Sequence, residues 1–299
     1  MEKKLIVITG GSGFLMSNFI KDYGHKYDIV APRSSEVNLV SGHGMKKLPA
    51  RPDAVIHSAA VYGGLVFNQK YPEKILLDNL RITANISEYI FKSNPRKTVI
   101  IGSACAYPNI TQGVLTEEMI GAGRMEKTVE IYAMNKMHLL SMVERCLNNW
   151  SYLILANMYG PGDHINVDKS HVVSAITQKL LLAQREKRDV QLLGTGDVYR
   201  SIVYVKDVCD VIDISINDIN NVVLNVGHET GLKINEIANI IAEEIDFKYK
   251  ILWGNKNDNG ASMKVLNYSK IDNIYPNRMK TDFKIGIKKT ISEYILNNQ

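Results

Sequence analysis

Short runs of consecutive apolar residues alternate with longer amphipathic stretches through the first half of this 299-residue chain. The predicted strands are Leu5–Ile8, Tyr27–Val30, Ala54–His57, Thr98–Ile101 and Tyr152–Leu155, and the predicted helices are Asn18–Tyr23, Pro72–Phe91 and Tyr132–Leu147. Unbroken apolar strands are buried on both faces, and strands separated by helices pair in parallel. The pattern predicts a Rossmann-type, doubly wound α/β fold, whose parallel sheet binds ligands at the carboxyl ends of its strands.

A glycine-rich turn joins the first strand to the helix that follows it, in the segment Thr9–Met16. Bare glycine backbone and a helix N-terminus together receive a pyrophosphate, and Gly10 and Gly13 have the spacing of a dinucleotide fingerprint. Met16 stands where the third glycine of the fingerprint, which permits close helix–strand packing, is expected. We expect Met16 to push the helix slightly outward and to leave the phosphate-binding amides in place. A purely structural turn is the alternative.

The tip of the second strand favours NADP over NAD. An acidic residue there binds the ribose 2′-hydroxyl of NAD, whereas an arginine suits the 2′-phosphate of NADP. This chain has Ala31-Pro32-Arg33-Ser34-Ser35, without an Asp or Glu. We predict that Arg33 holds the 2′-phosphate, and a solvated surface arginine is the alternative.

The alternation loosens after residue 162. Helices are predicted over 171–186, 234–244 and 287–296, and short apolar segments occur at 191–193 and 222–226. We therefore expect an NADP-binding domain over residues 1–162 and a smaller, mixed α/β substrate-binding lobe over residues 163–299. The boundary is expected to be discontinuous, with some later segments returning to the first domain.

A tyrosine and a lysine are placed one helical turn apart by Tyr132-Ala133-Met134-Asn135-Lys136, on the same helix face. An ammonium beside a phenol lowers the phenol's pKa from about 10, which makes it a usable general acid near neutrality. Ser103 follows the fourth strand, where its hydroxyl can bond a substrate carbonyl beside Tyr132. Together they predict a carbonyl-reducing enzyme that uses a nicotinamide cofactor. The alternative is a surface Tyr/Lys pair.

The composition of the chain limits the kinds of partner and the cell compartment that we expect for it. The net charge of +5 comes from scattered basic residues, and attraction of an anionic ligand accounts for it without a nucleic-acid partner. Since no run of about 18 apolar residues occurs, we predict no membrane span. The N-terminal apolar run is too short for a signal peptide. Cys105, Cys146 and Cys209 form no CxxC pair, which favours a reducing cytoplasm and argues against a zinc site.

Six further motifs follow one another along the chain. They are His57–Gly64 (similar to "AAxxGG"), the spaced Asn79 and Asn85, Gly102–Pro108 (close to "GSSCxYP"), Asn157–Asp163 ("NLYGPxD"), Ser170–Val172 ("SHV"), and Gly194–Gly196 with Arg200 ("WGxGxxxR"). With the glycine turn and the Tyr132/Lys136 pair, these motifs cover most of the chain. The sequence therefore resembles the extended short-chain dehydrogenase/reductase family, in its branch similar to GDP-L-fucose synthases.

The resemblance implies NADPH-dependent reduction at C4 of a GDP-linked 4-keto-6-deoxy sugar, a hexose or a heptose. Its C4 ketone acidifies the hydrogens on C3 and C5, so that a base can form an enolate that is reprotonated from the other face. Cys105 and His171 correspond to the family's proton-exchanging pair. Tyr132 then protonates the C4 oxygen, Ser103 positions that oxygen, and Lys136 holds the nicotinamide ribose. Alternatively, Cys105 is an inert apolar residue and His171 contacts only the cofactor amide.

The resemblance and the glycine turn also name the contacts of both ligands. Expected NADP contacts are Gly10, Gly11, Ser12, Gly13, Phe14, Leu15, Arg33, Asn38, Leu39, Ala59, Ala60, Tyr62, Ile101, Gly102, Lys136, Leu155, Asn157, Met158 and His171. Expected sugar-nucleotide contacts are Ser103, Ala104, Cys105, Tyr132, Asn157, Lys179, Leu193, Arg200 and Lys264. Lys179 and Arg200 are cations suited to the diphosphate.

Three positions depart from the family pattern: Leu193 replaces a tryptophan, His164 an asparagine, and Val61 a lysine. Because of these departures, a related GDP-4-keto sugar is at least as good a candidate for the substrate as the fucose precursor. Alternatives are a C4 reductase without epimerase activity, an NAD-recycling sugar-nucleotide 4-epimerase or dehydratase, and a non-catalytic dinucleotide sensor. We also expect a homodimer through the Tyr132 helix. The abundant Lys, Asn and Ile resemble a bacterial protein from an AT-rich genome, where such sugars build surface (capsule) polysaccharides.

Overall fold

The computed structural model describes residues 2–63, 65–110, 112–163, 171–217, 221–228, 231–256, 259 and 262–297. Gly64, His164 and Ser170, which belong to the motifs above, lie outside these residues.

Within the described residues, a six-stranded sheet forms the larger body of the protein. Its spatial order is β10 (Val222–Val226), β5 (Trp150–Leu155), β4 (Lys97–Ile101), β3 (Ala54–His57), β1 (Leu5–Thr9) and β2 (Asp28–Val30). All neighbouring strands are parallel. Every residue of β3, β4 and β5 is buried, which explains their unbroken apolar runs. The predicted Rossmann-type fold is confirmed.

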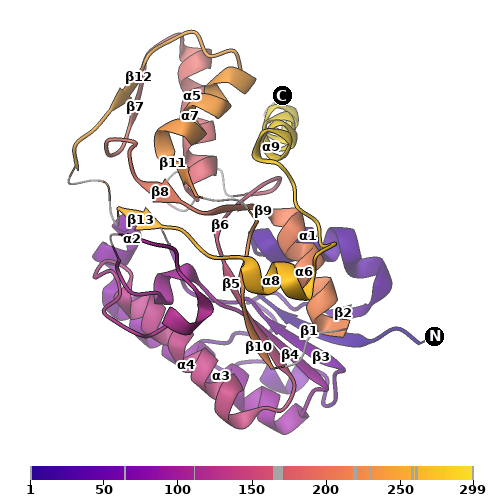
Figure 1. Ribbon diagram of the computed structural model, residues 1–299. Coiled ribbons are helices and arrows are strands. Elements are labelled where there is room, and N and C mark those ends of the chain that lie inside the picture. The colour runs from indigo at the N-terminus through magenta and orange to yellow at the C-terminus, as the bar shows by residue number, and fades with distance from the viewer. Residues whose placement is uncertain are drawn as a thin grey trace.

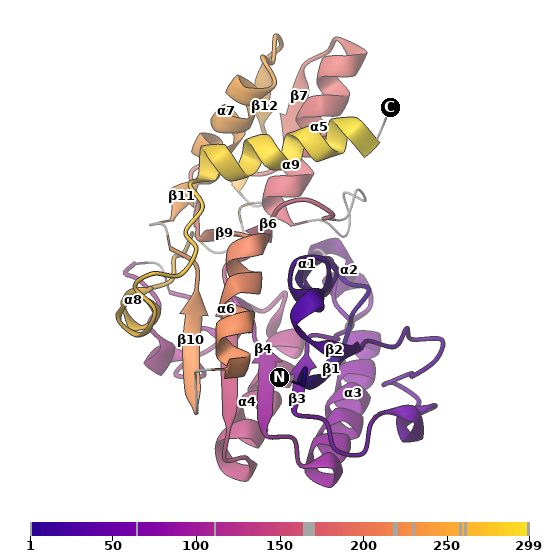
Figure 2. The same cartoon turned by 90° about the vertical axis from the view of Figure 1, so that its right-hand side faces the viewer.

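Helices cover both faces of this sheet (Figures 1 and 2). α1 (Phe14–Tyr23) packs against α6 (Val205–Asn217) on one face, and α3 (Pro72–Ser93) packs against α4 (Glu130–Cys146) on the other. α2 (Leu65–Lys70) precedes α3, and α8 (Ser269–Ile274) contacts β10. Short 3₁₀ turns are η1 (Gly24–Lys26), η2 (Met45–Lys47), η3 (Ala104–Ala106) and η4 (Glu117–Met119).

The strand order reverses at β1. The chain passes from β1 to β2 on one side and then returns to β3 on the other side. Helices that follow such strands leave on opposite faces, which opens a crevice at the carboxyl ends of β1 and β3. The glycine turn after β1 therefore lies at the point where this fold binds ligands.

A smaller body lies above the sheet in Figure 1. Its helices are α5 (Val172–Glu186), α7 (Ile234–Glu244) and α9 (Phe283–Asn297). Its short strand groups are β7 (Val190–Leu192) with β12 (Ile251–Trp253), β8 (Tyr199–Arg200) between β11 (Leu232–Lys233) and β13 (Met263–Lys264), and β6 (Asn157–Tyr159) with β9 (Ile202–Tyr204). Val173, Leu180 and Ile237 belong to its separate hydrophobic core.

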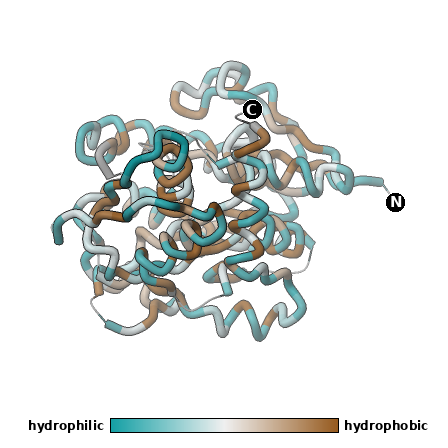
Figure 3. The backbone as a smooth tube through the Cα atoms, turned by 90° about the horizontal axis from the view of Figure 1, so that it is seen from above, coloured by the Kyte–Doolittle hydropathy of each residue, from teal (hydrophilic) through white to brown (hydrophobic). Residues whose placement is uncertain are grey.

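Segments from the C-terminal half also complete the sheet body. β10 is an outer strand of the large sheet, and Ile212 of α6 and Ile271 of α8 belong to its core. Seen from above, hydrophobic segments lie mainly toward the inside of the trace, and the outer turns are largely hydrophilic (Figure 3). The domain boundary at residue 162 stays a prediction.

The first helix begins earlier than predicted. α1 starts at Phe14, directly after Gly13, rather than at Asn18. Met16 is fully buried in the core of the sheet body, so its apolar side chain is packed at the position of the missing third glycine. The expected outward displacement of the helix stays a prediction.

Candidate active site

A cavity of about 630 Å³ lies at the carboxyl ends of the sheet strands. Most of the predicted site residues line it: Gly10, Ser12, Gly13, Phe14, Leu15, Asn38, Leu39, Ala59, Ala60, Tyr62, Ile101, Gly102, Ser103, Ala104, Cys105, Tyr132, Lys136, Leu155, Asn157, Met158, His171, Arg200 and Lys264. Gly11, Arg33, Lys179 and Leu193 are not among the lining residues. One cavity thus brings the proposed cofactor and substrate groups together.

The glycine turn forms one end of this cavity. Gly10 has a φ of +75°, and a Cβ atom there would lie 2.9 Å from the backbone nitrogen of Ala59. A side chain at Gly11 would meet Ala31 Cβ at 2.7 Å, so Gly11 serves the close packing of the turn on the segment after β2. Residues 12–15 line the cavity at the start of α1, where backbone N–H groups lack intrahelical partners. The turn is thus a bare cradle of amides that suits a pyrophosphate.

Two asparagines of α3 tie down two loops of the cavity wall. Asn79 is fully buried; its Oδ1 accepts from Val61 N at 2.8 Å and its Nδ2 donates to Val61 O at 2.7 Å. Asn85 Nδ2 donates to Leu39 O at 2.7 Å. Because Val61 and Leu39 both line the cavity, these bonds give the two spaced asparagines a physical role.

Arg33 lies at the far end of the cofactor half but not on its wall. Pro32 and Ser34 line the cavity on either side of it, and Arg33 itself is exposed. Its backbone N–H donates to Glu36 Oε2 at 2.8 Å. The contact of its guanidinium with a 2′-phosphate stays a prediction.

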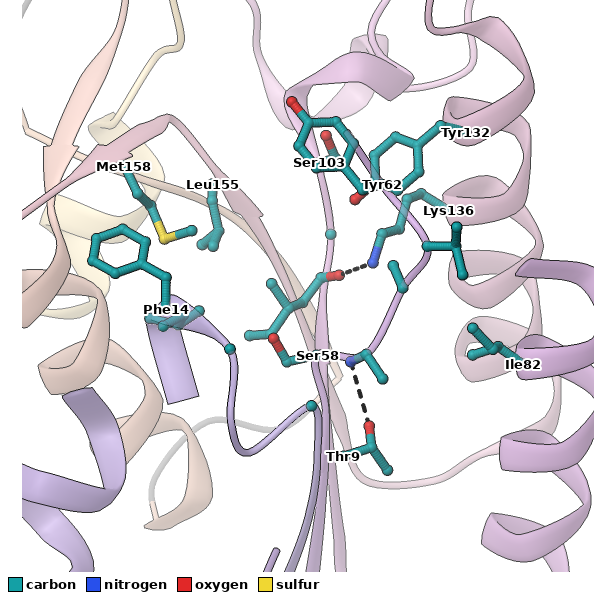
Figure 4. A pocket seen from close by; sticks show the side chains of 18 of the residues that line it. Thr9, Phe14, Ser58, Tyr62, Ile82, Ser103, Tyr132, Lys136, Leu155 and Met158 are labelled. Atoms are coloured by element: carbon teal, nitrogen blue, oxygen red, sulfur yellow. Dashed lines mark hydrogen bonds between the residues drawn. The ribbon is translucent and has the colours of Figure 1, made fainter. Parts of the chain in front are cut away.

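The chemical end of the cavity joins α4 to the end of β4 (Figure 4). Tyr132 and Lys136 both point from α4 toward the strand, with Ser103 and Tyr62 beside them. Lys136 is 1% exposed, its Nζ donates to Ile101 O at 2.7 Å, and Nζ lies 5.6 Å from the centre of the Tyr132 ring. The ring centres of Tyr62 and Tyr132 are 5.0 Å apart.

Burial sets the protonation of this pair. It raises the pKa of Tyr132 well above 10, with further contributions from Cys105, Tyr62 and Tyr152, while a hydrogen bond with Ser103 acts in the opposite direction. Burial also lowers the pKa of Lys136 to about 8. The expected lowering of the Tyr132 pKa is therefore wrong for this structure, because burial of the phenol disfavours the charged phenolate. Tyr132 keeps its proton at neutral pH.

Cys105 and His171 border the same cavity from opposite bodies of the protein. Cys105 follows β4, is partly exposed, and lies close enough to influence both Tyr132 and Tyr62. His171 immediately precedes α5; its Nδ1 is 3.3 Å from both carboxylate oxygens of Asp163. The structure brings the two together around one space, and their roles in proton exchange stay predictions.

The outer residues predicted to contact the sugar nucleotide divide into two groups. Arg200 and Lys264 line the cavity together with Glu126, whose Oε2 is 3.9 Å from Lys264 Nζ. Lys179 is partly buried further along α5, and Leu193 is 71% exposed after β7. Neither of these two reaches the cavity wall, because α5 and β7 carry them into the smaller body, so their substrate contacts stay predictions.

Sequence reasoning missed eleven residues of the wall. They are Thr9, Pro32, Ser34, Val37, Val40, Leu48, Ser58, Val61, Ile82, Glu126 and Ala156. Those at strand ends follow from the topology: Thr9 closes β1, and Ser58 and Ala156 come directly after β3 and β5. The apolar ones arrive through tertiary packing, which leaves no local signal in the sequence.

His57 lies buried beneath the cofactor wall. Its Nδ1 shares a hydrogen bond of 2.7 Å with Thr9 Oγ1, which in turn accepts weakly from Ala59 N (Figure 4). Burial lowers the pKa of His57 to about 3, so the ring is neutral.

In the described part of the chain, no group of three His, Cys, Asp or Glu side chains could hold a metal ion. No helix there is long and apolar enough to span a membrane.

Known proteins resemble this chain along nearly its whole length. It is 28% identical to GDP-L-fucose synthase of Dictyostelium discoideum, over 99% of this chain and 97% of that protein. It is also 28% identical to GDP-L-colitose synthase of Yersinia pseudotuberculosis, over 98% of each chain. A solved GDP-6-OMe-4-keto-L-xylo-heptose reductase from C. jejuni superposes with a TM-score of 0.91 at 22% identity, covering 100% of this chain and 99% of that chain.

A Naegleria fowleri GDP-L-fucose synthetase, solved with NADP bound, superposes with a TM-score of 0.86 at 24% identity, over 100% of this chain and 96% of that one. The profile of the family described as "NAD dependent epimerase/dehydratase" matches residues 6–227. The extended short-chain dehydrogenase/reductase resemblance inferred from the motifs is confirmed. The chain belongs to the NAD-dependent epimerase/dehydratase family.

Proposed function

We propose that this protein is an NADPH-dependent reductase that converts the C4 ketone of a GDP-linked 4-keto-6-deoxy sugar, a hexose or a heptose, to an alcohol. One observation carries the proposal. Ser103, Tyr132 and Lys136 meet at one end of a cavity whose other end is a glycine cradle for a dinucleotide. In this arrangement Tyr132 would serve as a proton donor at the point where a bound nicotinamide and a ketone would meet.

The residues present fit a dinucleotide. Any side chain at Gly10 would collide with the backbone of Ala59, and the start of α1 offers unpaired amides to a pyrophosphate. When bound, NADPH supplies the hydride that the protein lacks. Arg33 would pair with the 2′-phosphate by turning its exposed side chain along the Pro32–Ser34 rim, which favours NADPH over NADH.

The chain's own groups provide the acid and the orientation. Ser103 would donate a hydrogen bond to the C4 oxygen, and Tyr132 would donate its phenolic proton to that oxygen as negative charge develops on it. A buried phenol suits this task, because the raised pKa of Tyr132 keeps the proton in place until the oxygen becomes basic. Lys136, held by Ile101 O, would direct its other N–H groups to the nicotinamide ribose and stabilise the charge left on Tyr132.

Relatives support the choice of substrate. Two curated relatives that match nearly the whole chain are named for GDP-L-fucose and GDP-L-colitose synthesis. In this chain Arg200 and Lys264 line the cavity beyond the chemical end, where cations would bind the diphosphate of a GDP-sugar. We propose that epimerisation at C3 or C5 accompanies reduction, with Cys105 and His171 exchanging the protons.

We further propose a cytoplasmic homodimer. Exposed apolar side chains on α3 and α4 support the dimer: Leu76, Leu77, Leu80 and Phe91 on the first helix, and Met134 on the second. The two helices lie side by side on one face of the sheet (Figure 1), so a second copy would cover both at once.

The deciding experiment is incubation of the protein with NADPH and a panel of GDP-4-keto-6-deoxy hexoses and heptoses in D₂O. Stoichiometric NADPH oxidation, with NMR of the product showing a new C4 alcohol, is the expected result. An enzyme that recycles bound NAD consumes no NADPH, so product formation without net oxidation contradicts the reductase assignment. Deuterium at C3 or C5 reports the epimerase step separately.

A further inference from the structure

A buried carboxylate lies directly behind His171. The side chain of Asp163 is 0% exposed, and both of its oxygens are 3.3 Å from His171 Nδ1. Ser174 Oγ donates a hydrogen bond to Oδ2 of the same carboxylate. His171 lines the cavity whereas Asp163 is not among its lining residues. Asp163 therefore contacts the imidazole from the side away from the proposed substrate.

Neighbouring groups fix the orientation of this pair. The Phe14 ring packs against the His171 ring, with centres 5.9 Å apart and planes tilted by 46°. The loop that carries Asp163 is tied to α1, because Asn18 Nδ2 donates to Pro161 O at 2.9 Å. The imidazole is thus held between an aromatic ring of the cofactor turn and a carboxylate of an anchored loop, which limits rotation of its side chain.

The chemistry of the contact selects one form of the ring. A carboxylate accepts hydrogen bonds and does not donate them. Neutral His171 bonds Asp163 only when its proton is on Nδ1, and Nε2 then carries the lone pair. Since Nδ1 faces the wall, Nε2 is the nitrogen left for the cavity.

We propose that Asp163 is a positioning residue that fixes the Nδ1–H tautomer of His171 and so presents Nε2 as the proton-exchanging atom. This inference rests on the proposed function. During exchange, Nε2 takes the proton from the carbon beside the ketone, and the electron pair of the broken C–H bond moves into the enolate. The Asp163 carboxylate then lies against the imidazolium that has formed. The enolate carbon regains a proton either from Nε2 on the same face or from Cys105 on the other face, and in the second case Nε2 releases its proton to solvent.

The tautomer can be measured directly in the full-length protein. The protein is labelled with ¹⁵N in the rings of its seven histidines, and long-range ¹H–¹⁵N spectra are recorded. The signals of His171 are identified as those that are absent from the spectrum of the His171→Asn variant. Neutral wild-type His171 is expected as the Nδ1–H form. A neutral ring with its proton on Nε2 in the wild type overturns the inference without any assay of activity.

Variants then connect the tautomer to the chemistry. Asp163→Ala is expected to shift His171 toward the Nε2–H form and to lower deuterium entry at C3 or C5 of GDP-4-keto-6-deoxymannose at least tenfold, more than it lowers C4 reduction. Ser174→Ala is the matched control, because it removes a different hydrogen bond to the same carboxylate and keeps the carboxylate. Equal losses in both variants, with an unchanged tautomer, mean a structural role only and overturn the inference.

Failure of the positioning role and failure of the proposed epimerase activity give different results. A wild type with the Nδ1–H tautomer that introduces no deuterium contradicts the epimerase part of the proposed function, and His171 then serves the reductase without exchanging protons. A wild type that introduces deuterium from an Nε2–H ring contradicts the positioning role of Asp163 alone.

Discussion

Replacement of Asn79 by alanine is expected to loosen the cofactor wall of the cavity. Asn79 holds both the N–H and the C=O of Val61, at 2.8 and 2.7 Å, and its Nδ2 also reaches Ile75 O at 2.8 Å. The carbonyl of Ile75 keeps its place in the ladder of α3. In the variant, the backbone N–H and C=O of Val61 lose their hydrogen-bond partners. Segment 59–62, which lines the cavity, is then no longer held against α3.

The size of the effect follows from these contacts. An unsatisfied backbone group costs about 1–3 kcal/mol when buried. The bonds to Val61 are only partly buried, so water reaches the groups and the two together cost about 2–3 kcal/mol by the lower end of that range. A cost of 1 kcal/mol lowers Tm by about 2–4 °C in chains of about 150–250 residues, and the shift becomes smaller as the chain becomes longer. The lower end of that range applies to this chain, so Tm falls by about 4–6 °C.

Asn85→Ala is the matched control on the same helix, because it removes a single bond to Leu39 O at the other side of the cavity. Its cost is about 1 kcal/mol, and Tm should fall by about 2 °C. Thermal unfolding followed by circular dichroism, together with NADPH titration by fluorescence, measures both variants. If Asn79→Ala lowers Tm no more than Asn85→Ala and leaves the NADPH Kd unchanged, Asn79 does not anchor the wall.

Five further substitutions test the site and the fold. Tyr132→Phe should lower C4 reduction about a hundredfold or more while NADPH still binds; near-normal turnover would refute its role as the acid. Arg33→Ala should raise the KM for NADPH far more than the KM for NADH, and equal effects would contradict the 2′-phosphate contact. Cys105→Ser and His171→Asn should each block deuterium entry more than C4 reduction, as NMR of the product would show. Lys97→Met should raise Tm at pH 7, because Lys97 is only 4% exposed and burial lowers its pKa from 10.5 to about 8. The unfolded chain binds the lysine proton more tightly than the folded chain, so burial of the charged lysine destabilises the fold fully below pH 8. This destabilisation disappears as the pH rises toward 10.5. An equal gain in Tm at pH 7 and near pH 10 would contradict that reasoning.

The strands of the large sheet were predictable because burial on both faces leaves an unbroken apolar run. β3 has the predicted bounds, Ala54–His57, and β4 and β5 differ from theirs by one or two residues. β10 was recognised as an apolar segment but not as a member of this sheet. Its pairing with β5 joins segments far apart in the chain, and no local pattern carries that information.

The site was predictable where chemistry and topology fix a residue type at a strand end or a helix start. Gly10, Ser103 and Tyr132 belong to that class, and all three line the cavity. Residues assigned to the outer substrate region were less well placed. Leu193 and Lys179 do not reach the cavity, because their positions depend on how the smaller body sits on the sheet, and motif spacing does not determine that packing.

The protonation of Tyr132 shows why a correct residue can be assigned a wrong property. Spacing alone places the Lys136 ammonium near the phenol and predicts a lowered pKa. The structure adds that both groups are buried, and that Lys136 gives one of its N–H bonds to Ile101 O. Burial penalises each charged form, so the pKa of the phenol rises while that of the ammonium falls. The two shifts favour a protonated Tyr132 at rest, as a proton donor requires. The positive charge on Lys136 stabilises the reaction only when negative charge develops beside it, first on the substrate oxygen and then on Tyr132.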